Sequence, residues 1–151
     1  MNKKLKILFK ERGNVIHSVS GNTTIKKAVD IMNQHRIGAL MVINFEGEIE
    51  GIFTERDVMK KLADTDELVG HLKVRDIMTV REDMIISNGN ETMEEIMQLL
   101  AEKKIRHIPI VNEDGVLEGI ISIRDIIRIL LKDANQKVSQ LNNYITGKYP
   151  A

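Results

Sequence analysis

A hydroxyl side chain followed three positions later by an aspartate occurs twice in this chain, each time directly after a run that starts with Gly-Ile. Thr54 and Asp57 form the first pair, and Ser122 and Asp125 form the second. A hydroxyl residue after a strand-like run is typical of a helix start, where free amides and a partial positive charge can hold a phosphate. An ionised carboxylate one turn further only accepts hydrogen bonds, so it can take both hydroxyls of a ribose. The spacing favours two nucleotide sites that need no glycine-rich loop.

The same spacing also describes an ordinary helix start, in which the hydroxyl and the carboxylate cap the first turn. This purely structural interpretation would be the stronger one for a single copy, and the duplication in register weakens it. Arg56 and Arg124, one residue before each aspartate, would balance phosphate charge, although a solvated arginine is equally common at a helix start. Aliphatic residues at the strand ends, such as Ile120, can sandwich a purine.

The two pairs belong to a tandem repeat, since Gly51 and Gly119 are 119 − 51 = 68 residues apart and the same offset aligns Gly47 with Gly115. Each unit is predicted to contain a strand, a helix, a hairpin of two strands and a second helix, which makes the chain an α/β protein. Two equivalent units imply two equivalent sites. This arrangement is more typical of a ligand-binding module than of an active site.

Apolar spacing predicts the elements that must position these sites. One amphipathic helix is predicted in each unit. Its apolar positions are Ile25, Ala28, Val29 and Met32 in the first unit, and Met93, Ile96, Met97 and Leu100 in the second. Hairpins are predicted over 39–54 and 108–122, with a polar linker over 64–73 and the second unit starting again at 74–78. After Asp125 the apolar spacing of three and four predicts one long helix with a narrow seam that faces another helix, at Leu131, Ala134, Val138, Leu141 and Ile145.

The composition excludes several kinds of function. Lys and Arg number 22 and so do Asp and Glu, so no net charge draws the chain to nucleic acid or to an anionic membrane. The absence of cysteine removes thiol chemistry and suits a reducing cytoplasm. The four histidines share no metal-ligand spacing, and no nucleophile with its base and no Walker loop can be named. The basic start, residues 3–9, is too short for a signal-peptide core, and no run approaches a membrane span. We therefore expect a cytoplasmic protein without catalysis of its own.

The duplicated phrase Gly-Ile-x-Thr/Ser-x-x-Asp, preceded each time by a helix and a hairpin, resembles a pair of cystathionine-β-synthase (CBS) domains, and the resemblance covers almost the whole chain. It implies two repeats, at 8–70 and 74–133, packed by their sheets with pseudo-two-fold symmetry, and a helical tail at 134–151. It also implies two clefts for an adenosine nucleotide. AMP, ATP or NAD(H) is the expected ligand, and S-adenosylmethionine is less expected.

The resemblance also implies roles for individual residues. Asp57 and Asp125 correspond to ribose ligands, and Thr54 and Ser122 correspond to phosphate or hydroxyl ligands. First-strand residues and the first residues of each hairpin complete the clefts, at His17, Ile37, Gly38, Ile85, Arg106 and His107. Gly38 and Ala39 stand where the other repeat has Arg106 and His107, and the family arrangement puts that basic pair beside Thr54. The cleft of Thr54 is therefore expected to bind phosphate more strongly.

The resemblance and the apolar seam together predict a homodimer or tetramer. The predicted function is an energy- or redox-sensing regulatory module whose regulated partner the sequence does not identify. A scaffold or oligomerisation protein with vestigial clefts, working through its long C-terminal helix, is the alternative.

Overall fold

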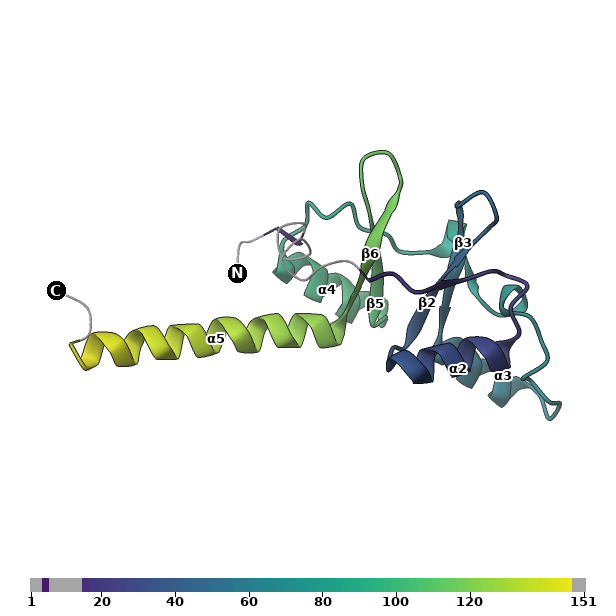
Figure 1. Cartoon of the computed structure of the whole chain (residues 1–151), viewed down its shortest axis with the longest axis horizontal. Helices are drawn as coiled ribbons and strands as arrows, with labels where there is room; N and C mark the ends of the chain where they lie inside the picture. The colour runs from purple at the N-terminus through teal and green to yellow at the C-terminus, as the bar shows by residue number, and fades with distance from the viewer. Residues whose placement is uncertain (1–3, 6–14, 148–151) are drawn as a thin grey trace.

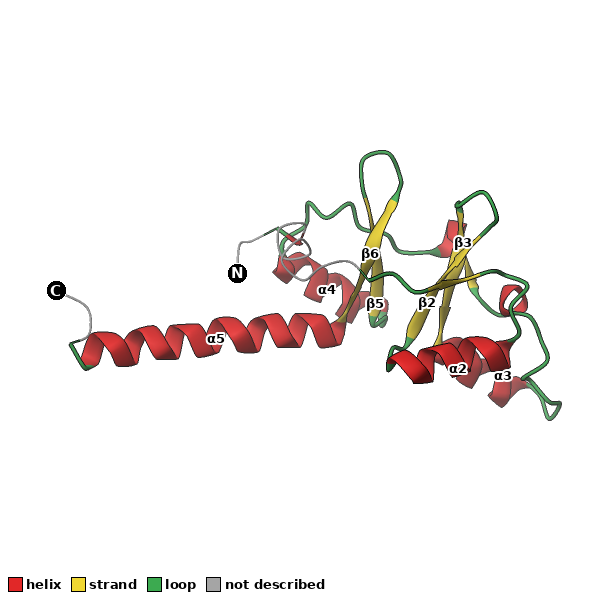
Figure 2. Cartoon of the chain, in the orientation of Figure 1, coloured by secondary structure: helices red, strands yellow, loops and turns green. Residues whose placement is uncertain are grey.

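The computed structural model describes residues 4–5 and 15–147. Its helices are α2 (Ile25–His35), α3 (Glu55–Asp64), α4 (Met93–Lys103) and α5 (Ile123–Ile145). Its strands are β1 (Ser18–Val19), β2 (Ala39–Ile43), β3 (Ile49–Thr54), β4 (Thr79–Val80), β5 (His107–Val111) and β6 (Leu117–Ser122), and the short turns η1 (Val74–Asp76) and η2 (Arg81–Asp83) flank β4. Figures 1 and 2 show the resulting α/β arrangement with its long last helix, as predicted. Most of the basic start and the last residues of the predicted tail lie outside the described residues.

The amphipathic helices and the hairpins form where the apolar spacing predicts them. Thr24 and Thr92 cap α2 and α4, because each hydroxyl accepts a hydrogen bond at 3.2 Å from the amide three residues later. The strands β2 and β3 are antiparallel in a four-stranded sheet of order β1-β2-β3-β4, and β5 and β6 form a separate antiparallel pair. Both predicted hairpins are thus confirmed.

The two repeats pack against each other through their sheets. Met41 and Ile52 of the first sheet share an apolar cluster with Ile120 of the second. Alternate strand residues point to the opposite face, where Leu40 packs with helix α2 and Ile108 packs with helix α4. The predicted packing by sheets is therefore confirmed.

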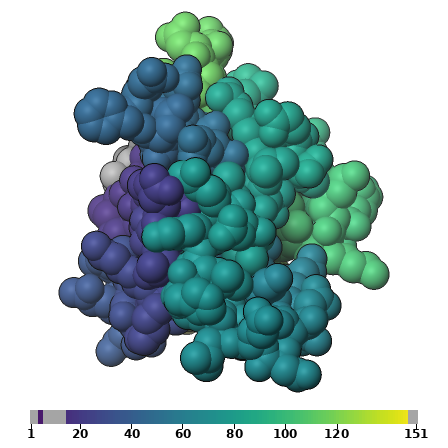
Figure 3. Space-filling model, turned by 90° about the vertical axis from the view of Figure 1, so that its right-hand side faces the viewer, coloured from purple at the N-terminus to yellow at the C-terminus, as the bar shows by residue number. Residues whose placement is uncertain are grey.

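The segment that follows α3 packs on the first repeat, although the 68-residue period places residues 74–80 at the start of the second. Val74 is wholly buried in the core cluster of the first repeat, and β4 pairs with β3. Gly51 makes this pairing possible, since a Cβ at that position would collide with the carbonyl oxygen of Thr79. Figure 3 shows this segment, in teal, spread beside the purple and blue surface of the first repeat.

Helix α5 starts against the second repeat and then extends away from the body of the molecule (Figure 1). Ile126 is buried, whereas Leu131, Val138 and Leu141 on the predicted seam are 59%, 56% and 61% exposed. Within the described part of the chain, no helix is long and apolar enough to cross a membrane.

Candidate functional site

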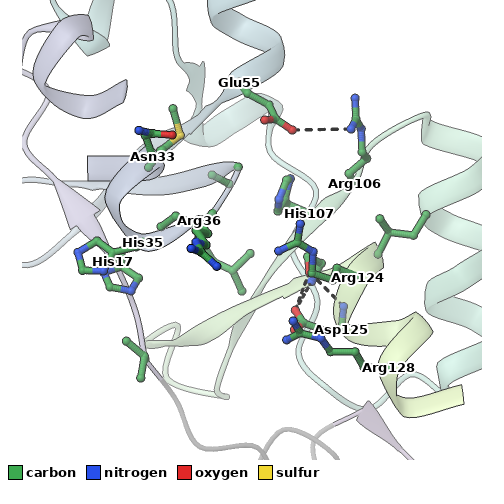
Figure 4. Close-up of a pocket in the computed structure, with 18 residues that line it drawn as sticks. His17, Asn33, His35, Arg36, Glu55, Arg106, His107, Arg124, Asp125 and Arg128 are labelled. Carbon is green, nitrogen blue, oxygen red and sulfur yellow. Dashed lines mark hydrogen bonds and ion pairs between the residues drawn. The ribbon is translucent and has the colours of Figure 1, made fainter. Parts of the chain in front are cut away.

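The second hydroxyl–aspartate pair opens onto a cleft of about 1010 Å³, which we call the Ser122 cleft. One wall comes from the second repeat, where β6 ends and α5 begins, and it carries Ser122 and Asp125. The other wall comes from the first repeat and carries His17 and the residues that join α2 to β2, including Gly38. Figure 4 shows His17 and Arg36 of the first repeat and Arg124 and Asp125 of the second around this cleft.

The first pair opens onto a second cleft of about 660 Å³, the Thr54 cleft. Thr54 and Asp57 lie on the wall formed by β3 and α3. The facing wall comes from the second repeat, with Ile85, the end of α4 and the first residues of β5. Each cleft therefore takes its helix start from one repeat and its facing wall from the other.

The sequence repeat relates the two clefts position by position. Positions 17 and 35–39 line the Ser122 cleft together with 120, 122–125 and 128. Positions 85 and 103–107 line the Thr54 cleft together with 52, 54–57 and 60. Adding 68 to the first-repeat positions of the Ser122 cleft, and subtracting 68 from its second-repeat positions, gives the positions of the Thr54 cleft. This correspondence confirms the predicted pseudo-two-fold relation.

Both hydroxyl–aspartate pairs cap their helices. The Oδ2 atom of Asp125 accepts hydrogen bonds from the amide and the hydroxyl of Ser122, both at 2.8 Å. The Oδ2 atom of Asp57 accepts the same two bonds from Thr54, at 2.8 Å from the amide and 3.2 Å from the hydroxyl. The helix-cap interpretation is therefore correct. The cap hydrogen bonds also hold the two half-buried carboxylates on the walls of the clefts. Burial raises the pKa of Asp57, while the hydrogen bonds from Thr54 and the charge of Lys60 oppose that rise.

Arg106 and His107 lie on both clefts. They border the Thr54 cleft as expected and the Ser122 cleft as well, so the stronger phosphate binding expected of the Thr54 cleft stays a prediction. The guanidinium of Arg106 is 3.7 Å from the carboxylate of Glu55, which also borders both. Burial lowers the pKa of His107, and the nearby charges of Glu55 and Asp125 counteract this.

Two histidines stack at one end of the Ser122 cleft. The ring centroids of His17 and His35 are 4.1 Å apart, with the ring planes 30° from parallel (Figure 4). Burial, together with the neighbouring His35, lowers the pKa of His17. Within the described residues no three potential ligand side chains gather in a way that could hold a metal ion.

Every residue predicted from the sequence to bind ligand borders a cleft, although its binding role stays a prediction. The Ser122 cleft holds His17, Ile37, Gly38, Ile120, Ser122, Arg124 and Asp125. The Thr54 cleft holds Thr54, Arg56, Asp57 and Ile85, and Arg106 and His107 border both. The sequence reasoning missed further basic residues on the clefts, notably Arg36 and Lys104 after the ends of α2 and α4, and Arg128 within α5. The repeat offset is the signal that could have found them, since 36 + 68 = 104 pairs two basic positions.

Comparison with known proteins agrees with this geometry. The family model of the CBS domain matches residues 12–64 and 69–132. A mitochondrial CBS domain-containing protein of Arabidopsis thaliana, CBSX3, is 36% identical over 129 residues, which cover 83% of this chain and 62% of that protein. The CBS domain-containing protein YhcV of Bacillus subtilis is 31% identical over 111 residues, covering 74% of this chain and 76% of the other. The chain thus spans less than two thirds of the plant relative's length.

Solved structures show the same fold. A CBS-domain containing protein from Agrobacterium tumefaciens superposes with a TM-score of 0.78 at 31% identity, covering 85% of this chain and 93% of the other. The CBS domain pair of protein MJ0100, in complex with 5′-methylthioadenosine and S-adenosyl-L-methionine, has a TM-score of 0.71 at 23% identity, covering 85% of this chain and 99% of the other. With its two sheet-packed repeats and its cleft-lining helix starts, the chain belongs to the CBS-domain family.

Proposed function

We propose that the protein is a regulatory module that binds an adenosine nucleotide in one or both clefts and has no catalysis of its own. The observation that carries this proposal is that both hydroxyl–aspartate helix starts border a cleft whose lining has more Lys and Arg than Asp and Glu. A helix cap with no binding role would have no need of such a lining. The MJ0100 pair supports the proposal in one respect only, since it is a case in which this fold holds adenosine-containing ligands.

The two helix starts supply complementary groups for a nucleotide. A carboxylate only accepts hydrogen bonds and has about four acceptor positions. The proposed role of Asp125 is to accept ribose hydroxyls, while the hydroxyl of Ser122 and the first amides of α5 contact the first phosphate. Ile120 and Ile37 supply apolar surface for the purine.

Charge favours a phosphorylated ligand. Four arginines border the Ser122 cleft against the two acids Glu55 and Asp125, and the arginines are Arg36, Arg106, Arg124 and Arg128. Arginine holds phosphate oxygens with paired donors. AMP, ATP and NAD(H) suit this basic lining, whereas S-adenosylmethionine would bring a sulfonium cation to it. We therefore rank S-adenosylmethionine last among the candidate ligands.

The exposed seam of α5 supports a homodimer, or a tetramer built from it. An isolated helix gains little stability in water without packing, and the projecting part of α5 carries an apolar stripe in place of a packed face. The stripe has the three-and-four spacing that pairs with a second helix of the same kind. We propose a second copy of the chain as its partner. This stripe is also the observation that favours the alternative of a scaffold protein with vestigial clefts.

The regulated protein and the compartment stay predictions. A sequence without cysteine suits the cytoplasm, and the plant relative is named as mitochondrial. The regulated partner is proposed to be a separate chain, because no catalytic constellation can be named in this one.

Thermal unfolding with added nucleotide tests the proposal. A ligand at about 100 times its Kd stabilises the folded state by about 2.7 kcal/mol, which raises the Tm of a domain of this size by about 5–10 °C. We expect that shift with AMP, ATP or NADH and none with UMP, and isothermal calorimetry should give saturable heat for the same ligands. No shift and no heat with any adenosine nucleotide at millimolar concentration would leave the scaffold alternative standing.

A further inference from the structure

Helices α2 and α4 are each followed directly by a basic residue in a left-handed backbone conformation. Arg36 has φ 54° and ψ 44°, and Lys104 has φ 54° and ψ 38°. Among the described residues these are the two positions other than glycine with positive φ. Glycine is the residue that usually ends a helix in this way, because a side chain with a Cβ is disfavoured there. Two such departures at equivalent positions of a repeat call for a reason beyond the fold.

Each of these residues borders a different cleft. Arg36 lies on the Ser122 cleft, and Lys104 lies on the Thr54 cleft. In Figure 4, Arg36 is drawn between the stacked histidines and the side of the cleft that carries His107 and Arg124. Neither basic residue forms an ion pair with another described residue.

Helix electrostatics alone does not account for the two residues. A cation near a helix C-terminus is favourable, because the last carbonyls carry partial negative charge. The last helical residues, His35 and Lys103, already supply basic groups at those ends, in ordinary helical conformation. A glycine after them would retain that benefit and avoid the left-handed cost.

We propose that Arg36 and Lys104 are phosphate-binding residues, and that Arg36 makes the Ser122 cleft the site for the ligand with the longer phosphate chain. This inference rests on the proposed function and specifies its ligand. The Ser122 cleft has the larger volume, about 1010 Å³ against 660 Å³. The Ser122 cleft is lined by four arginines and no lysine, whereas the Thr54 cleft is lined by two arginines and three lysines. Arg36 offers paired donors to phosphate oxygens, while Lys104 is a single point charge.

The substitution Arg36→Gly separates this role from a structural one. Glycine suits the left-handed position, so the Tm of the ligand-free protein should stay the same or rise. The variant should bind ATP about tenfold more weakly than the natural chain and should bind adenosine equally well. AMP should show a smaller loss than ATP, because the added phosphates are the ones assigned to Arg36.

Two variants serve as controls. Lys27→Gln removes a cation from the exposed surface of α2 that borders neither cleft, and it should leave ATP binding unchanged. Asp57→Asn weakens the proposed ribose contact in the Thr54 cleft, so calorimetry in that background reports mainly on the Ser122 cleft. In that background Arg36→Gly should reduce ATP affinity about tenfold and Lys104→Gly should not.

Each result decides between the two proposals. If the natural chain binds neither ATP nor AMP, the proposed function fails. If it binds ATP and Arg36→Gly binds ATP as tightly, the inference about Arg36 fails while the proposed function survives. A variant that loses thermal stability together with affinity for ATP and adenosine alike would show that Arg36 only supports the fold, which also overturns the inference.

Discussion

Asp125 is the residue at which the structural and the proposed binding roles can be separated most sharply. Its carboxylate caps α5 by accepting hydrogen bonds from the amide and the hydroxyl of Ser122, both at 2.8 Å. In the proposed function the same carboxylate accepts the ribose hydroxyls. The substitution Asp125→Ala removes both roles, whereas Asp125→Asn keeps a side-chain oxygen for the cap and loses the negative charge.

The two roles have different expected magnitudes. Loss of a helix cap costs about 1 kcal/mol, which lowers the Tm of a domain of this size by about 2–4 °C. Loss of two hydrogen bonds from ribose to a charged carboxylate costs about 2–4 kcal/mol, roughly 30- to 1000-fold in affinity. Asp125→Ala should therefore be slightly less stable without ligand and much weaker in binding AMP. Asp125→Asn should keep its Tm and lose about tenfold in affinity, since one charge-assisted bond becomes a neutral one.

The assay uses calorimetry with AMP and with 2′-deoxy-AMP in the Asp57→Ala background, which leaves one intact cleft. Because 2′-deoxy-AMP lacks one of the two hydroxyls, it should bind the chain with intact Asp125 about tenfold more weakly than AMP does. After Asp125→Ala the two ligands should bind nearly equally, since the group that distinguishes them is gone. Asp114→Ala, in the exposed β5–β6 turn, is the control that removes a carboxylate bordering neither cleft. If Asp125→Ala still prefers AMP by the original factor, the ribose assignment is refuted.

Three further predictions follow from the geometry. Burial lowers the pKa of His17 and of His107, whereas a bound phosphate favours their protonated forms. The affinity for ATP should therefore rise as the pH falls from about 8 to about 6, and a flat calorimetric pH profile would contradict this. Replacing both Val138 and Leu141 by glutamate puts charge on the exposed stripe of α5. Light scattering should then give the mass of a monomer where the natural chain gives that of a dimer, and an unchanged mass would exclude α5 as the interface. Gly51→Ala forces β4 away from β3 and should lower stability by about 1–3 kcal/mol, measured by urea unfolding; an unchanged midpoint would show that the strands adjust freely.

The elements were predictable because their signals are local. Helix-period spacing and a threonine cap place α2 and α4 within the sequence that forms them. The hydroxyl–aspartate pairs likewise cap their own helices through contacts three residues apart. Such contacts depend on neighbours in the chain, so the sequence contains all of the information that they require.

The features that sequence reasoning missed depend on which segments meet in space. Residues 74–80 pack on the first repeat, because Val74 enters its core and β4 pairs beside Gly51, and neither contact follows from the 68-residue period. The position of Arg106 on both clefts depends on how the two sheets face each other. The repeat offset pairs the basic residues at positions 36 and 104, but their left-handed conformation is visible only in the folded chain.

The way in which the clefts are assembled explains how a duplicated sequence can yield unequal sites. The hydroxyl and aspartate of the helix starts recur in both repeats, so the end of the cleft assigned to ribose is chemically the same in each. The facing walls differ, since Gly38 corresponds to Arg106 and Arg36 corresponds to Lys104. The facing wall of each cleft comes from the repeat that does not supply the helix start. A substitution in that wall therefore alters the cleft that contains the aspartate of the other repeat. In the proposed function, ligand preference is therefore a property of the pair, and neither repeat could be assigned a ligand by itself.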